Sequence, residues 1–129
     1  MMPTTREWID KAEEDFEVAG VLAKSKTGRF SNTICNHCQQ CTEKYLKAVL
    51  QENSLPVPRT HDLVELLDLV VPVIPMLEAS RGACQELTRY ATIFRYPGFD
   101  TSREDSKRAI SLCASIRRDV RHYFQLESL

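Results

Sequence analysis

The stretch from residue 30 to 52, FSNTICNHCQQCTEKYLKAVLQE, is the feature that most constrains how this chain can fold. Its apolar residues recur at steps of three and four, at Ile34, Cys38, Cys41, Tyr45 and Val49. Its polar residues gather elsewhere, at His37, Gln40, Lys44, Lys47 and Gln51. A helix places side chains with this spacing on separate faces, so the stretch predicts a long helix with one core face and one polar face.

Helical patterns also run through the segment before this stretch, and clean alternation of the kind found in strands is lacking. A first helix is expected from Thr4, which has capping-box spacing to Glu7, to about Lys26. Its core stripe is predicted to be Ile9, Ala12, Phe16, Ala19 and Ala23. Prolines and turn formers in residues 53–60 predict a loop after the second helix.

The next part of the chain predicts two more helices. A short third helix, capped by Thr60 or Asp62, is expected to hold Leu63, Leu66, Leu67 and Val70. Pro72 and Pro75 interrupt the pattern, because proline is tolerated in a first turn but not inside a helix. A fourth helix is then expected through Leu77, Ala83, Cys84, Leu87, Ala91 and Phe94.

A final helix follows a turn at residues 96–100, and Thr101 has capping-box spacing to Glu104. This helix is predicted to bury Ala109, Cys113, Ile116, Val120 and Phe124. Together the patterns predict an all-α fold, an antiparallel up-and-down helical bundle of four long helices plus one short helix. Its length predicts a single domain over residues 1–129.

The composition indicates a soluble protein without a membrane segment. Hydrophobic residues make up 43% and charged residues 27% of the chain, and no apolar run approaches the roughly 20 residues of a membrane helix. The N-terminal segment MMPTTREWIDKAEEDF lacks the features of a secretory signal, so a cytoplasmic location is expected. The net charge of −1 gives no overall attraction to nucleic acid, so any such site would be local.

The cysteine spacing raises the question of a metal site, because Cys35, Cys38 and Cys41 stand three residues apart. On a continuous helix, Cys35 and Cys41 would lie about 9 Å apart along the axis and about 120° apart around it. Sulfurs that share one zinc lie under about 4 Å apart, and no fourth cysteine follows as in iron–sulfur motifs. We therefore predict no metal site, and reduced cysteines that pack in or near the core.

Basic residues on the last helix are the weak catalytic candidates. Arg117 and His122 have the Arg-x4-His spacing in which a ribonuclease uses histidine for proton transfer and arginine to stabilise the transition state. Positions five apart on a helix point about 140° away from each other. Exposed basic residues near a helix end also explain the spacing, whereas Arg118 and His122 share a face.

Two other polar pairs each allow more than one interpretation. His61 and Asp62 fit either a catalytic pair or ordinary capping at a helix start. Asp15 is expected to be partly buried and to need a cation such as Lys44, which favours a structural ion pair over catalysis. None of the four glycines stands in a dinucleotide-binding or Walker loop, which excludes familiar nucleoside triphosphatases.

Four segments read together resemble the HEPN domain family, named for higher eukaryotes and prokaryotes nucleotide-binding. They are Trp8…Ala12…Asp15…Ala19, then HCQQCTEKYLKA from His37, then Thr60-His-Asp-Leu63, then Arg95-Tyr-Pro97. The resemblance implies a helical bundle, usually a homodimer, often acting with a minimal nucleotidyltransferase in a toxin–antitoxin-like pair. It also implies a nucleotide or RNA ligand near the dimer cleft. No cofactor is expected.

Carried over position by position, the resemblance implies a set of ligand-binding residues: Gln40, Lys44, Lys47, His61, Arg95 and Tyr96. Lysine and arginine have suitable chemistry for phosphate, and Tyr96 could stack on a base. Glu43 and Lys47, spaced four apart, are alternatively explained as an ion pair on a helix surface.

The chain departs from the nuclease branch of the family, whose Arg-x4–6-His motif lies at the turn into the last long helix. Here that place reads Arg95-Tyr-Pro-Gly-Phe-Asp-Thr-Ser and has no histidine. The first hypothesis is therefore a non-enzymatic dimeric module that binds a nucleotide or a nucleotidyltransferase. One alternative is a metal-independent ribonuclease toxin that uses Arg117 or Arg118 with His122, within one chain or across a dimer axis. The other is a purely structural dimerisation domain.

Overall fold

Helices make up most of the computed structural model, which describes residues 1–92 and 96–126. The α-helices are α1 (Pro3–Leu22), α2 (Ser31–Glu52), α3 (Leu63–Val70), α4 (Arg81–Thr88) and α5 (Arg103–Tyr123). Two short 3₁₀ segments, η1 (Pro75–Ser80) and η2 (Arg89–Ala91), flank α4. There is no strand within the described residues, and the predicted all-α bundle is confirmed.

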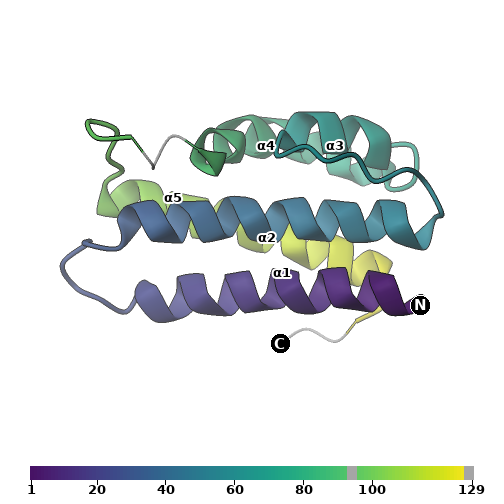
Figure 1. Cartoon of the computed structure of the whole chain (residues 1–129), viewed down its shortest axis with the longest axis horizontal. Coiled ribbons are helices and arrows are strands. Elements are labelled where there is room, and N and C mark those ends of the chain that lie inside the picture. Colours follow the sequence, from purple (N-terminus) through teal and green to yellow (C-terminus); the bar gives the residue numbers. More distant parts are fainter. Residues whose placement is uncertain (93–95, 127–129) are drawn as a thin grey trace.

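The long helix α2 lies in the middle of the bundle, in contact with α1, α3, α4 and α5 (Figure 1). α1 runs antiparallel to α2. The hydrogen bond from Thr5, near the start of α1, to Glu52, at the end of α2, shows this direction. The chain returns through α3 and α4, and α5 then runs in the same direction as α2. A 3.1 Å hydrogen bond joins Asn53, directly after α2, to Tyr123, the last residue of α5.

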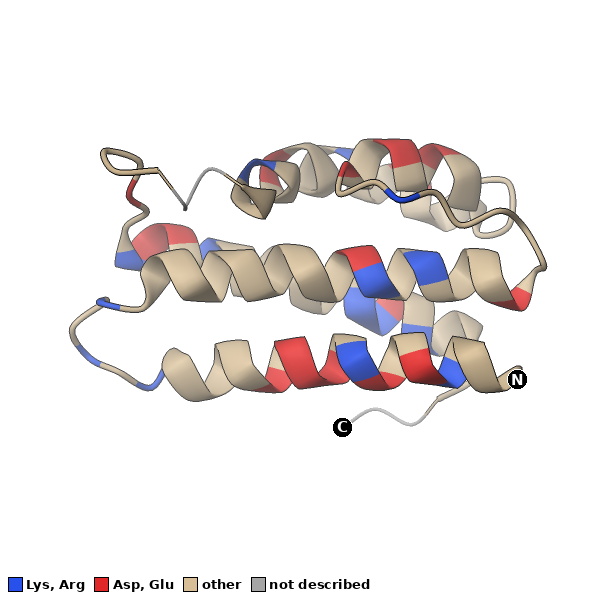
Figure 2. Cartoon of the chain, viewed as in Figure 1, with Lys and Arg blue, Asp and Glu red and all other residues tan. Residues whose placement is uncertain are grey.

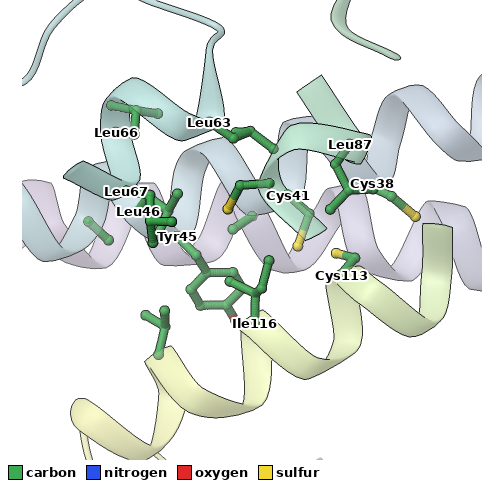
Figure 3. Close-up of a cluster of buried hydrophobic side chains, with 14 of the residues drawn as sticks. Cys38, Cys41, Tyr45, Leu46, Leu63, Leu66, Leu67, Leu87, Cys113 and Ile116 are labelled. Carbon is green, nitrogen blue, oxygen red and sulfur yellow. The ribbon is translucent and has the colours of Figure 1, made fainter. Parts of the chain in front are cut away.

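The core follows the predicted apolar stripe of α2, all of whose five members are at most 3% exposed. Cys38 and Cys41 meet Cys113 between α2 and α5, and leucines of α3 cover another side of α2 (Figure 3). All five cysteines of the chain are free and buried. Burial raises the pKa of the Cys35 thiol to about 11 and that of Cys84 to about 12. These thiols stay protonated at neutral pH and pack as small apolar groups, as predicted.

The N-caps of two helices differ from the sequence expectations: Met2 rather than Thr4 precedes α1, and Ser102 rather than Thr101 precedes α5. α1 begins at Pro3 without a side-chain cap, since proline is already suited to a first turn, and the predicted Thr4 capping box is absent. α5 does begin with a capping box, but its members are Ser102 and Asp105. Thr101 instead gives its backbone N–H and its hydroxyl to Asn32 on α2. Its bonding to α2 leaves Ser102 as the capping residue.

The expected fourth helix is divided into η1, α4 and η2, and α4 itself has only eight residues. Leu77, Cys84 and Leu87 are buried as predicted, whereas Phe94 lies outside the described residues. α1 ends at Leu22 rather than near Lys26, which leaves Ala23 exposed instead of in the core stripe.

The last helix buries four of its five predicted core residues, Ala109, Cys113, Ile116 and Val120, while Phe124 is half-buried. None of the described helices has the length and apolar character needed to cross a membrane.

Candidate functional site

Two regions gather most of the polar residues singled out from the sequence. The first, which we call the α2 face, consists of Asp15 with His37 and Lys44, and of Glu43 with Lys47 and His61. It lies where α2 meets α1 and the loop before α3. Charged residues of both signs adjoin each other on α1 and α2 in Figure 2.

Asp15 has two hydrogen-bonding partners on α2, Lys44 and His37. Its carboxylate accepts a hydrogen bond from Lys44 Nζ at 2.5 Å, and its other oxygen lies 2.8 Å from Nδ1 of His37. Asp15 is only 8% exposed. The structure thus brings Asp15 and Lys44 together as a partly buried ion pair, as the sequence indicated, and adds His37 to it.

Glu43 forms the second cluster in the same way. Its carboxylate lies 2.9 Å from Lys47 Nζ and 2.8 Å from Nδ1 of His61. The spacing of four residues does produce an ion pair, but Glu43 and Lys47 are buried rather than on the surface. Lys47 Nζ also lies 5.6 Å from the centre of the Trp8 ring, a cation–π contact that desolvates it further.

His61 and Asp62 serve different purposes in the structure. Asp62 accepts a hydrogen bond from the N–H of Val64 and caps α3. His61 is well exposed, but one of its ring nitrogens is held by Glu43. The capping interpretation is therefore confirmed for Asp62, whereas His61 belongs to the α2 face.

The other predicted ligand residues are distributed more widely. Gln40 donates to Gln39, which in turn donates to Glu43 and to the carbonyl of His61, so Gln40 is linked to the Glu43 cluster. Tyr96 is 61% exposed in the turn before α5, and no described hydrogen bond joins it to the α2 face. Arg95 lies outside the described residues.

The second region is a hollow of about 460 Å³ on α5, which we call the α5 groove. Its lining residues are Ala114, Arg117, Arg118, Arg121, His122 and Leu126. All three weak catalytic candidates therefore line one hollow. Arg117 and His122 lie about 140° apart around the helix, so they border opposite sides of it, with Ala114 and Arg121 between them.

Glu13 of α1 binds the arginines on the inner side of this groove, Arg117 and Arg121. Arg117 grips its carboxylate with two hydrogen bonds of 2.7 Å and stacks over Phe16, 4.4 Å from the ring centre. Arg121 lies 3.5 Å from the same carboxylate and donates to the hydroxyl of Tyr45, which in turn donates to Glu13. Sequence reasoning missed Glu13, although a buried tyrosine hydroxyl requires a polar partner.

Arg118 and His122 are exposed on the outer side of the groove. Arg118 has only a long, 3.4 Å contact with the Ser115 hydroxyl and no carboxylate partner among the described residues. By contrast, each lysine of the α2 face is paired with its own carboxylate. Arg118 therefore leaves positive charge open on the outer side of the groove.

Both central carboxylates are held ionised by their partners. Burial opposes ionisation of Glu43, but hydrogen bonds from His61, Lys47 and Gln39 outweigh it and lower the pKa of this carboxyl. At Glu13 burial is likewise outweighed, by Arg117 and Tyr45 first, so its pKa is also lowered. Each carboxylate is a fixed negative charge at neutral pH. No group of three or more metal-binding side chains occurs among the described residues.

Comparison with known proteins supports the same fold and identifies the family. The HEPN domain model matches residues 5–123. The chain belongs to the HEPN domain family. The crystal structure of TT1696 from Thermus thermophilus superimposes with a TM-score of 0.81 over 94% of this chain and 98% of that one. At 20% sequence identity, this similarity shows the helical-bundle fold alone. A search of curated proteins found no match.

Membership of the HEPN family supports a nucleotide-binding or ribonuclease-type module. In this HEPN chain the match spans both the α2 face and the α5 groove. The family alone therefore does not choose between them, and the choice depends on which charged groups are open to a ligand.

Proposed function

We propose that this HEPN chain binds the phosphates of RNA or of a nucleotide in the α5 groove. The observation that carries the proposal is the position of Arg118, an exposed arginine with no carboxylate partner among the described residues, beside His122 in a hollow of about 460 Å³. Guanidinium groups bind phosphate oxygens through paired N–H donors, and arginine stays charged at every relevant pH. The net charge of −1 for the whole chain makes this a local attraction.

The geometry of the groove supports a division of labour between its arginines. Arg117 and Arg121 are fixed by Glu13 and Tyr45, so their positions cost little to organise when a ligand binds. Arg118 and His122 are exposed four residues apart and are open to a phosphate. A ligand would thus meet an ordered inner wall and two adaptable outer side chains.

The direct test is binding of a fluorescent single-stranded RNA of about ten nucleotides, followed by anisotropy at low salt. We expect Arg118→Ala to weaken binding about tenfold, the value of one charged hydrogen-bonded contact. Lys107→Ala is the matched control, because Lys107 is an exposed cation on α5 outside the groove lining. The RNA affinity of this variant should stay within about twofold of wild type. Equal RNA affinities of Arg118→Ala and Lys107→Ala would contradict the proposal that RNA binds in the α5 groove.

The residues carried over from the family form the competing ligand site in the same titration. Gln40, Lys44, Lys47, His61, Arg95 and Tyr96 remain proposed ligand residues. A phosphate at the α2 face would have to compete with Asp15 and Glu43 for the two lysines. Loss of RNA binding in Lys44→Ala together with full binding in Arg118→Ala would move the site to the α2 face.

Assembly is part of the proposal. We infer that the chain acts as a homodimer in the cytoplasm and partners a minimal nucleotidyltransferase in a toxin–antitoxin-like pair. Family membership supports both inferences. Sedimentation equilibrium of the purified chain tests the dimer, and co-purification with a nucleotidyltransferase encoded beside it tests the partner. A monomer at all concentrations would overturn the first inference.

A metal-independent ribonuclease is the second candidate function. It is favoured by Arg118 and His122 lining one groove, since a histidine can transfer a proton and a nearby arginine can stabilise the charge on the reacting phosphate. Purified protein is incubated with mixed RNA in EDTA, and cleavage is expected to be lost in His122→Ala. Cleavage that persists undiminished in this variant would exclude the mechanism.

A further inference from the structure

A third hollow lies away from both regions, between the loop after α2 and the outer side of α3. It measures about 420 Å³, and we call it the proline groove. It is lined by Leu50, Leu55, Pro56, Val57, Pro58, Glu65, Asp68, Leu69 and Pro72. Seven of these nine residues are apolar, and two acidic residues stand on α3.

Two large apolar side chains of the proline groove face solvent in the free protein. Leu55 is 40% exposed and Leu69 is 43% exposed. The core does not require Leu69, because α3 already buries Leu63, Leu66, Leu67 and Val70 on its inner side. Single exposed leucines are ordinary, but here they share one hollow with three prolines, and a contiguous apolar hollow with a polar rim is typical of an interaction site.

The proline groove is also preformed. The N–H of Leu55 donates to the carbonyl of Leu50 at 3.0 Å, which fixes one end of the loop. The other end is fixed by the bond of His61 to Glu43 and by Asp62, which caps α3. Pro56 and Pro58 restrict the backbone between these ends. Little conformational entropy is therefore lost when a partner binds there.

The two walls restrict how a partner chain can dock. Pro56 and Pro58 have no N–H group, so the loop cannot receive an added β-strand through a regular hydrogen-bond ladder. The opposite wall is a helix, whose backbone groups bond within α3. A helix laid into the groove with its apolar side down satisfies its own backbone and needs only side-chain contacts.

The acidic rim restricts the charge of the partner. Asp68 is already paired with Arg81 at 2.8 Å. Glu65 is exposed and has no partner among the described residues. A lysine or arginine on the partner would meet an unpaired carboxylate there, whereas an acidic residue would be repelled.

We propose that the proline groove docks an amphipathic helical segment of a partner protein, carrying two large apolar residues one turn apart and a flanking lysine or arginine. A cavity of about 150 Å³ holds one benzene-sized group. The hollow of about 420 Å³ therefore has room for at least two such side chains. The inference does not depend on RNA binding, because no residue of the proline groove lines the α5 groove.

The test is a displayed library of random helical peptides selected on the folded wild-type protein, with selected peptides then measured by titration. Peptides with two large apolar residues three or four positions apart and a nearby lysine or arginine should be enriched. Leu69→Glu should weaken them at least tenfold, and Glu65→Lys should favour acidic peptides instead. Val21→Glu is the control, since Val21 is an exposed apolar residue on α1 and should not change binding.

Circular dichroism confirms folding of each variant, and the substituted side chains are exposed, so unfolding does not confuse the result. Selection of no peptide that prefers wild type over Leu69→Glu would overturn the docking site. Enriched peptides that bind wild type and Glu65→Lys equally would overturn the part played by the acidic rim. RNA binding measured on the same variants should be unchanged.

Discussion

The α2 face and the α5 groove are built from similar residues, but their charges are arranged differently. On the α2 face Lys44 is paired with Asp15 and Lys47 with Glu43, one carboxylate for each lysine. In the α5 groove Glu13 binds both Arg117 and Arg121, while Arg118 has no described carboxylate partner. One region neutralises its cations internally, and the other leaves positive charge at the surface.

This difference shows that residue type alone does not make a phosphate site. A lysine buried against its own carboxylate must break that pair before it can bind a ligand, which costs desolvation energy as well as the pair itself. An exposed arginine beside others already fixed in place has no such cost. The clusters of the α2 face are therefore better suited to holding α1, α2 and the loop before α3 together.

The largest expected effect that tests this contrast is the loss of stability in Glu43→Ala. The substitution leaves Lys47, which is only 6% exposed, without its counter-charge, and it frees His61. Removing one partner of a buried pair costs about 3–5 kcal/mol. Urea unfolding followed by circular dichroism measures the change.

Two controls accompany that measurement. Glu86→Ala removes a carboxylate whose partner, Arg108, has a side chain 64% exposed, and the loss there should stay under about 1 kcal/mol. Adding Lys47→Met to Glu43→Ala should recover much of the stability, because no unpaired charge then remains. Equal losses of unfolding free energy in Glu43→Ala and Glu86→Ala would mean that the ion pairs of the α2 face stabilise the fold no more than an exposed pair does.

The fold could be predicted from the sequence because its information is local. Steps of three and four in residues 30–52 defined α2 and its buried stripe, and the capping aspartate of α3 was among the two expected. The division of the fourth helix into η1, α4 and η2 could not be predicted, because residues three apart share a face in both an α-helix and a 3₁₀ segment. The capping box of α5 stands one residue later than expected, because Thr101 bonds to Asn32 on α2 instead.

The candidate site was less predictable, because its contacts join residues far apart in the chain. The pair of Asp15 with Lys44 followed from burial on an amphipathic helix. Nothing local indicated that Glu13 would accept Arg117 across 104 positions, or that His61 would reach Glu43. Helical angles correctly separated Arg117 from His122, but they could not show that both border one hollow.

The smaller expected effect is a difference in acid sensitivity between the two regions. The folded protein lowers the pKa of Glu43 below its ordinary value of 4.5, so the ionised form stabilises the fold. That stability is fully present above pH 4.5 and is lost as the pH falls through the lower pKa of the folded state. The difference in unfolding free energy between wild type and Glu43→Gln should therefore narrow as urea unfolding is repeated from about pH 7 down to about pH 3.

Arg118→Ala is the control, because Arg118 has no carboxylate partner among the described residues. Its difference in unfolding free energy from wild type should not change with pH. A gap for Glu43→Gln that stays constant over this range would show that Glu43 acts through packing rather than through its charge.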